Sequence, residues 1–292
     1  MDFNIINWNC NGLNSHFDEL AHFVANAKIK PTIICLQETH ATSNILPALT
    51  GYSYTHNFRK DRKGGGTAIY IINDVYYNIL NIDSLVSSEI EITGIEVPLK
   101  NNNVTLDVYS IYIAPNIKFN SENLKQLLKN KNHVILGDLN AKNSLWGSPF
   151  SDFRGKIIAN FLEDNDLVCL NTGEGTRINN NASVSHLDLS ICNSSLSSKV
   201  AWEVLANSWG SDHYPTTIRF VSNLSNIGPA LNVANCKNWN LNKADWIGFT
   251  ENIKSNLPLL TNQDEINDNY LSLTKLILNA ADSSIPLKKF KN

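Results

Sequence analysis

The sequence predicts a four-layer α/β sandwich, in which two packed mixed β-sheets are flanked by helices, with a helical extension at the C-terminal end. Three observations lead to this expectation. Segments with strand character greatly outnumber helical ones, whereas a doubly wound order would place a helix after nearly every strand. The segment 32–36 is apolar on both faces, as a central strand covered by helices is. After about residue 222 the pattern changes to a linker and two amphipathic helices.

The N-terminal elements can be assigned one by one. Residues 3–8 read as a strand, and a helix follows, because Ser15 and Asp18 have the spacing of a capping box and apolar residues recur around them at helical intervals. Pro31 then separates this helix from the strand at 32–36. Later segments show the same two periodicities. The β-rich runs lie at 67–72, 75–82, 92–97, 104–113, 134–136, 187–192 and 216–221, and the helical signals at 122–128 and 156–163.

The chain divides near residue 222. Residues 222–229 are rich in Ser, Asn, Gly and Pro, in the pattern of a linker. Beyond them, apolar residues at helical spacing predict two amphipathic helices, one at 246–257 and one at 266–281. We therefore expect one domain over residues 1–222, followed by a linker and an amphipathic helical extension over residues 223–292.

Composition and charge exclude several classes of protein. The 292 residues carry 24 Lys and Arg against 27 Asp and Glu, a net charge of −3, so the chain does not coat nucleic acid through bulk electrostatics. A hydrophobic fraction of 42% excludes disorder throughout. No apolar run approaches the roughly 20 residues of a membrane helix, and the five cysteines form no C-x-x-C pair. We therefore expect a soluble intracellular protein, nuclear or cytoplasmic.

Polar residues gather where predicted strands end. Open α/β architectures bind ligands outside the carboxyl ends of their strands, so we expect these polar segments to converge in space. They lie at 8–12, 37–40, 109–116, 137–140 and 210–213.

Two carboxylates in these segments follow apolar strands. Glu38 comes directly after the strand at 32–36, and hard divalent cations prefer such oxygen ligands. Asp138 and Asn140 alternate around Leu139, so they would share one face if the strand continued. The carboxylate could then exchange a proton with a reacting oxygen while the amide donates to a phosphoryl oxygen. The alternative for this pair is an Asx turn after the strand.

Further polar residues, in these segments and at position 188, have chemical or structural interpretations. His213 is a candidate for proton transfer, because an imidazole titrates near neutrality. Asp188 lies between two leucines and would be costly to bury without a partner. Asn9 and Asn11 alternate at a strand end. Tyr112 could offer its phenol to a phosphoryl oxygen, with packing under a loop as the alternative.

Taken together, these segments resemble the endonuclease/exonuclease/phosphatase superfamily of metal-dependent phosphodiesterases, over residues 1 to about 221. The resemblance implies that one set of residues holds Mg²⁺, or alternatively Mn²⁺, that a second handles protons and phosphoryl oxygens, and that a third contacts DNA. The metal set is Glu38, Asp212 and Asn11; the catalytic set is Asp138, His213, Asp188, Asn140, Tyr112 and Asn9; the DNA set includes Asn116 and Thr176. Asp188 would fix the tautomer of His213 as a triad Asp does. Whether Asp138 or His213 takes the proton stays open.

The chain as a whole is negatively charged, but one basic stretch could supply a local positive field for DNA. Lys60, Arg62 and Lys63 precede three glycines at 64–66, which would allow close approach of the backbone to phosphates. We therefore add these three side chains to the predicted DNA contacts. A solvated loop is the alternative.

Several segments resemble jockey-type non-LTR retrotransposons more narrowly. Within the first domain these are 8–13, 145–147 followed by Arg154 and Gly155, and 185–189. In the extension, 239–246 and 280–286 resemble the segment that joins endonuclease to reverse transcriptase in those elements. The chain would then be the N-terminal portion of a polyprotein with a downstream reverse transcriptase domain, or a truncated copy of one.

The resemblance implies a metal-dependent endonuclease that nicks double-stranded target DNA by phosphodiester hydrolysis and leaves a 3′-hydroxyl to prime reverse transcription. Three alternatives remain: an abasic-site repair endonuclease, a phosphatase of inositol or sphingolipid head groups, and a catalytically decayed copy that only binds nucleic acid or partners. Asn11 disfavours repair, because many repair enzymes carry Asp at the matching position. The intact carboxylates and His213 argue against decay.

Overall fold

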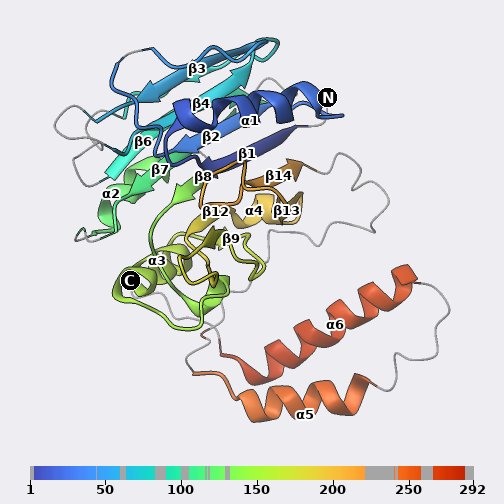
Figure 1. The fold of residues 1–292 in the computed structure, drawn as a ribbon. Helices are drawn as coiled ribbons and strands as arrows, with labels where there is room; N and C mark the ends of the chain where they lie inside the picture. The colour runs from blue at the N-terminus through green and yellow to red at the C-terminus, as the bar shows by residue number, and fades with distance from the viewer. Residues whose placement is uncertain are drawn as a thin grey trace. The chain divides into compact units, whose positions relative to one another are not determined.

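The computed structural model describes most of the chain, and Figure 1 shows its fold. The described residues are 3–43, 45–59, 64–82, 90–99, 105–115, 117, 119–128, 132–220, 240, 243–257 and 266–286. The chain forms two compact units, Met1–Ser222 and Asn223–Asn292. Among the described residues, no helix combines the length and the apolar character that crossing a membrane requires.

Two six-stranded sheets and a short hairpin make up the described strands of the first unit. In spatial order, the first sheet consists of β13 (Val200–Val204), β14 (Thr216–Phe220), β1 (Asn4–Asn9), β2 (Ile33–Gln37), β4 (Thr67–Ile72) and β3 (Tyr52–Asn57). The second consists of β5 (Asn78–Ile79), β6 (Ile90–Pro98), β7 (Thr105–Ile113), β8 (His133–Asp138), β12 (Asp188–Asn193) and β9 (Leu167–Cys169). The hairpin pairs β10 (Arg177–Ile178) with β11 (Val184–Ser185). Because β1 and β2 run parallel, as do β7 and β8, while their other neighbours are antiparallel, both sheets are mixed.

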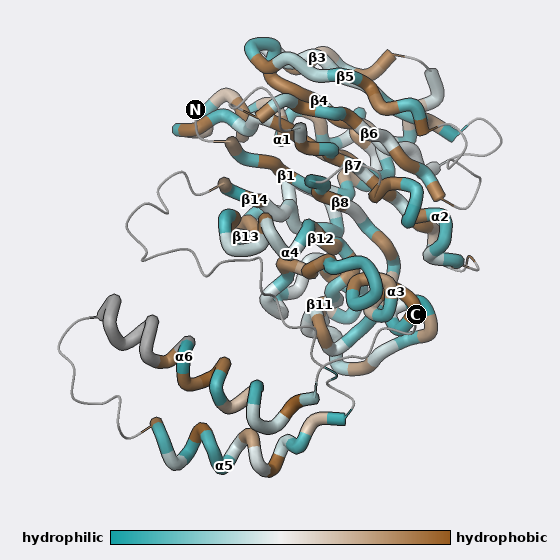
Figure 2. The backbone as a smooth tube through the Cα atoms, turned by 180° about the vertical axis from the view of Figure 1, so that it is seen from behind, coloured by the Kyte–Doolittle hydropathy of each residue, from teal (hydrophilic) through white to brown (hydrophobic). Residues whose placement is uncertain are grey.

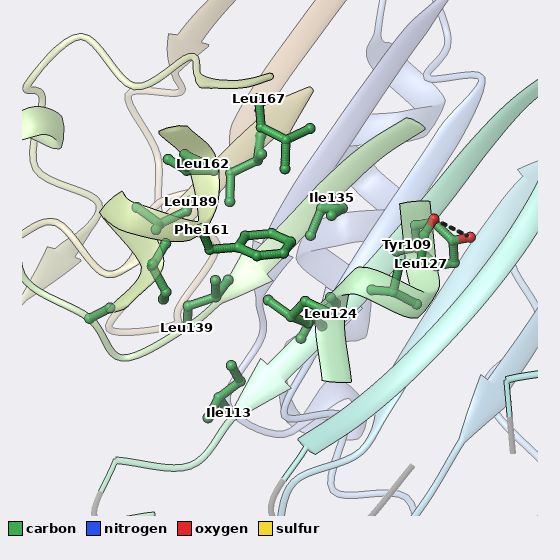
Figure 3. Packing of buried hydrophobic residues seen from close by; sticks show 14 of the residues in the cluster. Tyr109, Ile113, Leu124, Leu127, Ile135, Leu139, Phe161, Leu162, Leu167 and Leu189 are labelled. Atoms are coloured by element: carbon green, nitrogen blue, oxygen red, sulfur yellow. Dashed lines mark hydrogen bonds between the residues drawn. The ribbon is translucent and has the colours of Figure 1, made fainter. Parts of the chain in front are cut away.

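Helices flank the two sheets, which confirms the predicted sandwich (Figure 1). Helix α1 (Leu13–Asn26) buries Leu20 and Val24 in a cluster with apolar residues of β1 and β2. Helix α3 (Phe153–Asp164) packs on the second sheet, and Figure 3 shows its Phe161 among other buried side chains of that cluster. Four shorter helices complete the first unit as described: α2 (Glu122–Lys125), η1 (Gln126–Leu128), η2 (Ser144–Trp146) and α4 (Ser194–Ser197).

The space between the sheets is mainly apolar, but several buried polar contacts cross it, and one of them helps to set the register of the sheets. In Figure 2 hydrophobic residues run along the strands of both sheets. Gln37 at the end of β2 donates from Nε2 to the Ser110 hydroxyl of β7 at 2.8 Å and to the side-chain carbonyl oxygen of Asn7 at 2.9 Å. Ser110 in turn donates to the Leu36 carbonyl at 2.9 Å. A buried amide that donates across two sheets specifies one alignment, because any slip would leave it unpaired.

Some predicted boundaries were wrong for local reasons. Helix α1 begins at Leu13, ahead of the predicted capping box, and its N-cap is Gly12 at φ 102° with no side-chain cap. The early start follows from backbone pairing, since the N–H groups of Gly12 and Leu13 donate to the carbonyls of Glu38 and Thr39 at 2.7 and 3.1 Å. The β-rich run at 75–82 forms only the two-residue strand β5.

Five of the described strands were not predicted from the sequence. β3 and β13 lie at the edges of the first sheet and β9 at an edge of the second, while β10 and β11 form the separate hairpin. An edge strand is only partly covered, so its sequence lacks the apolar run that marks a central strand. The polar composition of β3, Tyr-Ser-Tyr-Thr-His-Asn, illustrates this.

The described part of the second unit is a pair of helices. Helix α5 (Trp246–Asn256) is capped by Asp245, whose side chain accepts from the Gly248 N–H at 2.9 Å, and α6 (Ile266–Ser284) packs against it. Leu276, Ala280 and Ala281 of α6 are buried. The predicted linker at 222–229 lies outside the described residues.

Candidate active site

Four strand ends bring predicted polar residues together at one edge of the sandwich. Asn9 is the last residue of β1 and Glu38 follows β2, its parallel neighbour. Asp138 is the last residue of β8 and lies opposite Asp188, the first residue of β12. His213 lies in the segment before β14. Because β1 and β8 belong to different sheets, both sheets contribute to the site.

A single amide joins the two carboxylates that the sequence placed at strand ends. Asn9 is fully buried, and its Nδ2 donates to Glu38 Oε1 at 2.8 Å and to Asp138 Oδ2 at 2.9 Å. A neutral donor between two acidic groups lowers their mutual repulsion without neutralising either. The structure therefore brings Asn9, Glu38 and Asp138 into direct contact.

Two Asx turns of the same form hold these groups in place. The Asn9 Oδ1 accepts from the Asn11 N–H at 3.1 Å, and the Asp138 Oδ1 accepts from the Asn140 N–H at 2.9 Å. Asn11 and Asn140 have φ values of 43° and 46°, in the left-handed region that Asn tolerates better than most residues. In each turn, Oδ1 accepts from the backbone N–H two residues later. The second polar atom, Nδ2 of Asn9 or Oδ2 of Asp138, is left to face across the site.

This geometry corrects the predicted strand alternation. Strand β8 ends at Asp138, so Asn140 does not share its face by a continued pleat. The Asn140 amide instead donates from Nδ2 to the Ile113 carbonyl at 3.1 Å. The same holds for Asn11, which follows the end of β1 and points Nδ2 at Asp212 Oδ1, 3.1 Å away. For Asp138 and Asn140, the Asx turn is the conformation observed.

A buried histidine and aspartate form the second half of the site. His213 Nδ1 lies 2.8 Å from Asp188 Oδ2, and its Nε2 lies 3.9 Å from Asp138 Oδ2. His213 is 2% exposed. Ser211 holds its backbone, because the Ser211 hydroxyl accepts from the His213 N–H at 3.1 Å and donates to the Asn9 carbonyl at 2.8 Å. The contact with Asp188 orients the ring so that Nε2 faces Asp138.

Burial and neighbouring charge shift the proton affinities of this group. Burial, together with the Asp188 carboxylate, raises the pKa of Asp138 to about 7. Burial opposes charge on His213, but the carboxylates of Asp188 and Asp138 outweigh it and raise the pKa of His213 to about 9. Near neutral pH, His213 is therefore cationic while Asp138 exchanges its proton readily.

Asp212 links the buried residues to the rim of the site. Its Oδ1 accepts from Asn11 Nδ2, and its Oδ2 accepts from Arg177 Nε at 3.0 Å. Burial opposes ionisation of Asp212, but the charges of His213 and Arg177 hold its pKa below the ordinary value. Both carboxylate oxygens thus already accept hydrogen bonds from the protein. Arg177 was not predicted from the sequence, because nothing in the pattern of a two-residue strand shows where its side chain points.

Tyr112 lies close to the acidic groups. It pairs with Asp138 across β7 and β8 and is buried. Burial and the nearby carboxylates of Glu38 and Asp138 raise the pKa of its phenol well above the ordinary value. Tyr112 therefore keeps its proton at neutral pH and can act only as a hydrogen-bond donor or a neutral acceptor.

Of the predicted DNA contacts, only Thr176 lies within the described residues. It is fully buried, and its hydroxyl accepts from the backbone N–H groups of Leu187 and Asp188, each at 3.2 Å. That placement does not fit a direct contact with DNA, and it explains instead how the start of β12 is held. Lys60, Arg62, Lys63 and Asn116 lie outside the described residues.

The described residues on either side of the basic stretch are held by hydrogen bonds and an ion pair. Glu91 of β6 pairs with the guanidinium of Arg59 and accepts from the Gly66 N–H. On the other side, the N–H groups of Thr39 and His40 donate to the carbonyls of Gly66 and Gly65 at 3.2 and 2.8 Å. The glycines that follow residues 60–63 therefore pair with the segment directly after Glu38.

Arg154 is a structural residue of the site whose role the sequence does not reveal. It lies on α3, is 8% exposed, and donates to the carbonyls of two loops that flank the site. The acceptors, at 2.9 to 3.5 Å, are the carbonyl oxygens of Ile113, Ala114, Pro115, Ile117, Leu139 and Asn140. In the sequence, Arg154 and Gly155 stand out only as part of a motif. The partners of Arg154 are far away along the chain, so no local pattern could have revealed them.

The donors present fit a divalent cation. Glu38 offers carboxylate oxygens at the half-buried mouth of the site, and oxygen ligands are those that Mg²⁺ prefers. Asp138, Asp188 and His213 also offer ligand atoms that lie within 4.8 Å of one another. A cation among those three would have to replace the hydrogen bond between His213 and Asp188, so Glu38 is the better anchor.

Comparison with known proteins places this geometry in a family context. Residues 106–217 match the family described as "Endonuclease-reverse transcriptase". Among curated proteins, the probable RNA-directed DNA polymerase from transposon X-element of Drosophila melanogaster is 28% identical over 184 residues, which is 61% of this chain and 19% of that protein. The RNA-directed DNA polymerase from mobile element jockey of the same species is 28% identical over 173 residues, 58% of this chain and 18% of that protein. The chain thus spans about a fifth of the length of these relatives.

Solved structures show the same fold. The endonuclease domain of TRAS1, a telomere-specific non-LTR retrotransposon, has a TM-score of 0.61 at 21% identity, covering 75% of this chain and 98% of that one. An AP endonuclease from Leishmania major has a TM-score of 0.58 at 16% identity, covering 75% and 88%. The family match, the relatives and the fold agree: residues of the first unit are similar to the endonuclease domains of jockey-like non-LTR retrotransposons, and they share the fold of an AP endonuclease.

Proposed function

We propose that this chain is a Mg²⁺-dependent endodeoxyribonuclease that nicks double-stranded DNA by phosphodiester hydrolysis, leaving a 3′-hydroxyl from which a reverse transcriptase can prime synthesis. The observation that carries the proposal is the contact of Asn9 with both Glu38 and Asp138, beside the pair of His213 and Asp188. Together these groups offer oxygen ligands, a proton-exchanging carboxylate and a cation at one site. The similarity to retrotransposon proteins favours DNA as the substrate and a downstream reverse transcriptase as the partner domain.

In this mechanism Glu38 would hold the metal, with Asp212 or Asn11 as further ligands. The bound ion supplies Lewis-acid stabilisation of charge on the phosphate. Side chains of the protein transfer the proton and orient the phosphate. Asp138 takes a proton from the attacking water as the bond between phosphorus and the 3′-oxygen breaks, and the cationic His213 faces the developing negative charge with Nε2. Asn140 and Tyr112 would orient the phosphate oxygens, since both lie next to Asp138.

A plasmid assay tests the proposal directly. The purified chain is incubated with supercoiled plasmid in Mg²⁺, and open-circular product is followed on a gel. We expect nicking that stops on addition of EDTA and returns with excess Mg²⁺, because the acidic site needs a cation before it can accept a phosphate. End-labelling with a polymerase then shows whether the product carries a usable 3′-hydroxyl. Nicking that persists in EDTA would contradict the proposal.

The same chain also allows a comparison with abasic-site repair. A duplex oligonucleotide with one abasic site competes with an intact duplex of the same sequence. The proposed function predicts no strong preference for the abasic duplex. A strong preference would instead support a repair endonuclease, the alternative that shares this fold.

Replacement of Lys60, Arg62 and Lys63 by Ala should weaken DNA binding and reduce its dependence on salt. Each cation that neutralises a phosphate adds roughly 0.9 to the slope of log K against log salt concentration. Because the glycines that follow these residues are held beside the segment after Glu38, we expect these side chains to contact DNA phosphates. Fluorescence anisotropy with a labelled duplex at several NaCl concentrations measures the slope. An unchanged slope would show that the stretch is a solvated loop.

A further inference from the structure

One cation at the rim of the site is fixed in place and only partly used. Arg177 is the first residue of β10, and its Nε donates to Asp212 Oδ2 at 3.0 Å. Its side chain is 38% exposed. Within the described part of the chain, only Nε of this guanidinium has a hydrogen-bond partner. The two terminal amino groups can therefore donate to a bound anion.

The position of Arg177 is tied to the catalytic residues by backbone contacts. Arg177 forms a β-bridge with His213, and the Ile178 N–H donates to the Asp212 carbonyl at 2.7 Å. On the other side, the Tyr214 N–H donates to the Thr176 carbonyl at 2.7 Å. The start of the β10–β11 hairpin and the segment that carries His213 therefore form one paired unit. A change in the position of His213 would move Arg177 with it.

Its partner carboxylate is fixed as well. Asp212 accepts from Asn11 Nδ2 at 3.1 Å, and the Asn11 N–H is held by the Asn9 side chain. An arginine whose carboxylate partner cannot move loses little rotamer freedom when it binds a second anion, because its side chain is already ordered. The pair is therefore a preorganised anion-binding group.

A cation at this position would offset the negative charge of the site. Glu38, Asp138, Asp188 and Asp212 gather at one edge of the sandwich, and an approaching polyanion is repelled by each ionised carboxylate. The first domain has no excess of basic residues that would offset this repulsion from a distance. Asp212 and the other nearby carboxylates keep Arg177 charged at any physiological pH.

Thr176 and Arg177 are neighbours in the chain but differ in exposure. Thr176 directs its hydroxyl to the backbone of Leu187 and Asp188 and is fully buried. Arg177 instead pairs with Asp212, and its side chain is 38% exposed. The DNA contact that the sequence suggested for Thr176 is thus available one residue later.

We propose that Arg177 binds the phosphodiester backbone of the DNA beside the scissile position, through the two amino groups that Asp212 leaves free. This inference rests on the proposed endonuclease function and adds a specific substrate contact to it. A planar guanidinium binds a phosphate with two parallel hydrogen bonds, which an ammonium cannot do. Arg177 therefore contributes both to affinity and to the orientation of the phosphate at His213.

The test compares three variants of the full chain with the parent. Arg177→Met removes the charge, Arg177→Lys keeps the charge without the fork, and Arg219→Met is the matched control. Arg219 is also an arginine on a strand that pairs with a carboxylate, Glu203, at 2.9 Å, but it belongs to β14 and its pair is exposed. Binding to a labelled duplex is measured in EDTA over a range of NaCl concentrations, and circular dichroism checks the fold.

We expect Arg177→Met to weaken binding about tenfold, the effect of losing roughly 1.4 kcal/mol of charge-assisted hydrogen bonding. The salt slope should fall by about one unit. Arg177→Lys should keep the slope but lose part of the affinity, and Arg219→Met should match the parent in both. Equal slopes for Arg177→Met and Arg219→Met would overturn the inference.

Arg177→Met also leaves the Asp212 carboxylate without its partner, which could by itself weaken the binding of DNA. A further pair of variants separates the two effects. Arg177→Met in an Asp212→Asn background is compared with Asp212→Asn alone, so that no half-buried carboxylate is left without its partner. The loss of slope should persist in this pair. A parent that nicks plasmid while the Arg177 variants bind normally would defeat only this inference. A parent that neither binds nor nicks duplex DNA would defeat the proposed function itself.

Discussion

Plasmid nicking should fall at least about 100- to 10 000-fold when Asp138 is replaced by Ala, the range expected for loss of a proton-transfer group. The carboxylate accepts from the Asn9 amide that also donates to Glu38, and it lies 3.9 Å from His213 Nε2. One substitution therefore removes both the proton site and a polar contact between the two sheets. His213→Ala should lower the rate by a similar factor. Steady-state nicking of purified protein in Mg²⁺ gives the comparison.

The folded state should tolerate the loss of Asp138. Burial and the neighbouring Asp188 make this carboxylate costly to ionise, so its removal relieves repulsion inside the site. We therefore expect Asp138→Ala to unfold at the same temperature as the parent or slightly above it, as happens when active-site charges are removed. Asp18→Ala, at an exposed position of α1, is the control and should nick at the parent rate. Retained activity in well-folded Asp138→Ala would contradict the assignment.

Arg154→Met should lower the free energy of unfolding by about 3–5 kcal/mol, more than any other single substitution at or around the site. The substitution leaves buried carbonyl oxygens of two loops without their donor, and each unsatisfied buried acceptor costs about 1–3 kcal/mol. Arg154→Lys should recover little, because one ammonium cannot reach the carbonyls of both loops at once. Chemical denaturation followed by circular dichroism measures the difference.

The control for Arg154 is again Arg219→Met. Arg219 is exposed and forms a surface ion pair with Glu203, and such pairs contribute about 0–1 kcal/mol. Its removal should shift the unfolding free energy by less than about 1 kcal/mol. A loss no larger than this for Arg154→Met would mean that the two loops hold their conformation without this side chain.

The sequence could predict the sandwich and the convergence of its strand-end residues, because both depend on local patterns. Glu38 follows an apolar strand, and Asp188 interrupts one, so their positions at the edge of a sheet could be anticipated. The strands that escaped prediction lie at sheet edges or in the separate hairpin, where partial exposure weakens the apolar signal. The start of α1 was misplaced because the backbone of the Glu38 turn, far away in sequence, caps it.

The fine geometry of the site depends on contacts that sequence spacing does not encode. Alternation along a strand suggested that Asn140 would point with Asp138, but a left-handed residue ends that alternation. Arg154 acts through carbonyls 14 to 41 residues away, and no periodicity marks such partners. For Arg177, a strand of two residues is too short for its pattern to say which face each side chain takes.

The paired Asx turns have a consequence for assembly. One turn ends a strand of the first sheet and the other ends a strand of the second, and the Asn9 amide meets Asp138 only when both sheets have docked in register. A partly formed molecule, with one sheet folded and the other not, would hold only half of the polar residues of the site. Under the proposed function, plasmid nicking would therefore report that both sheets have folded and docked.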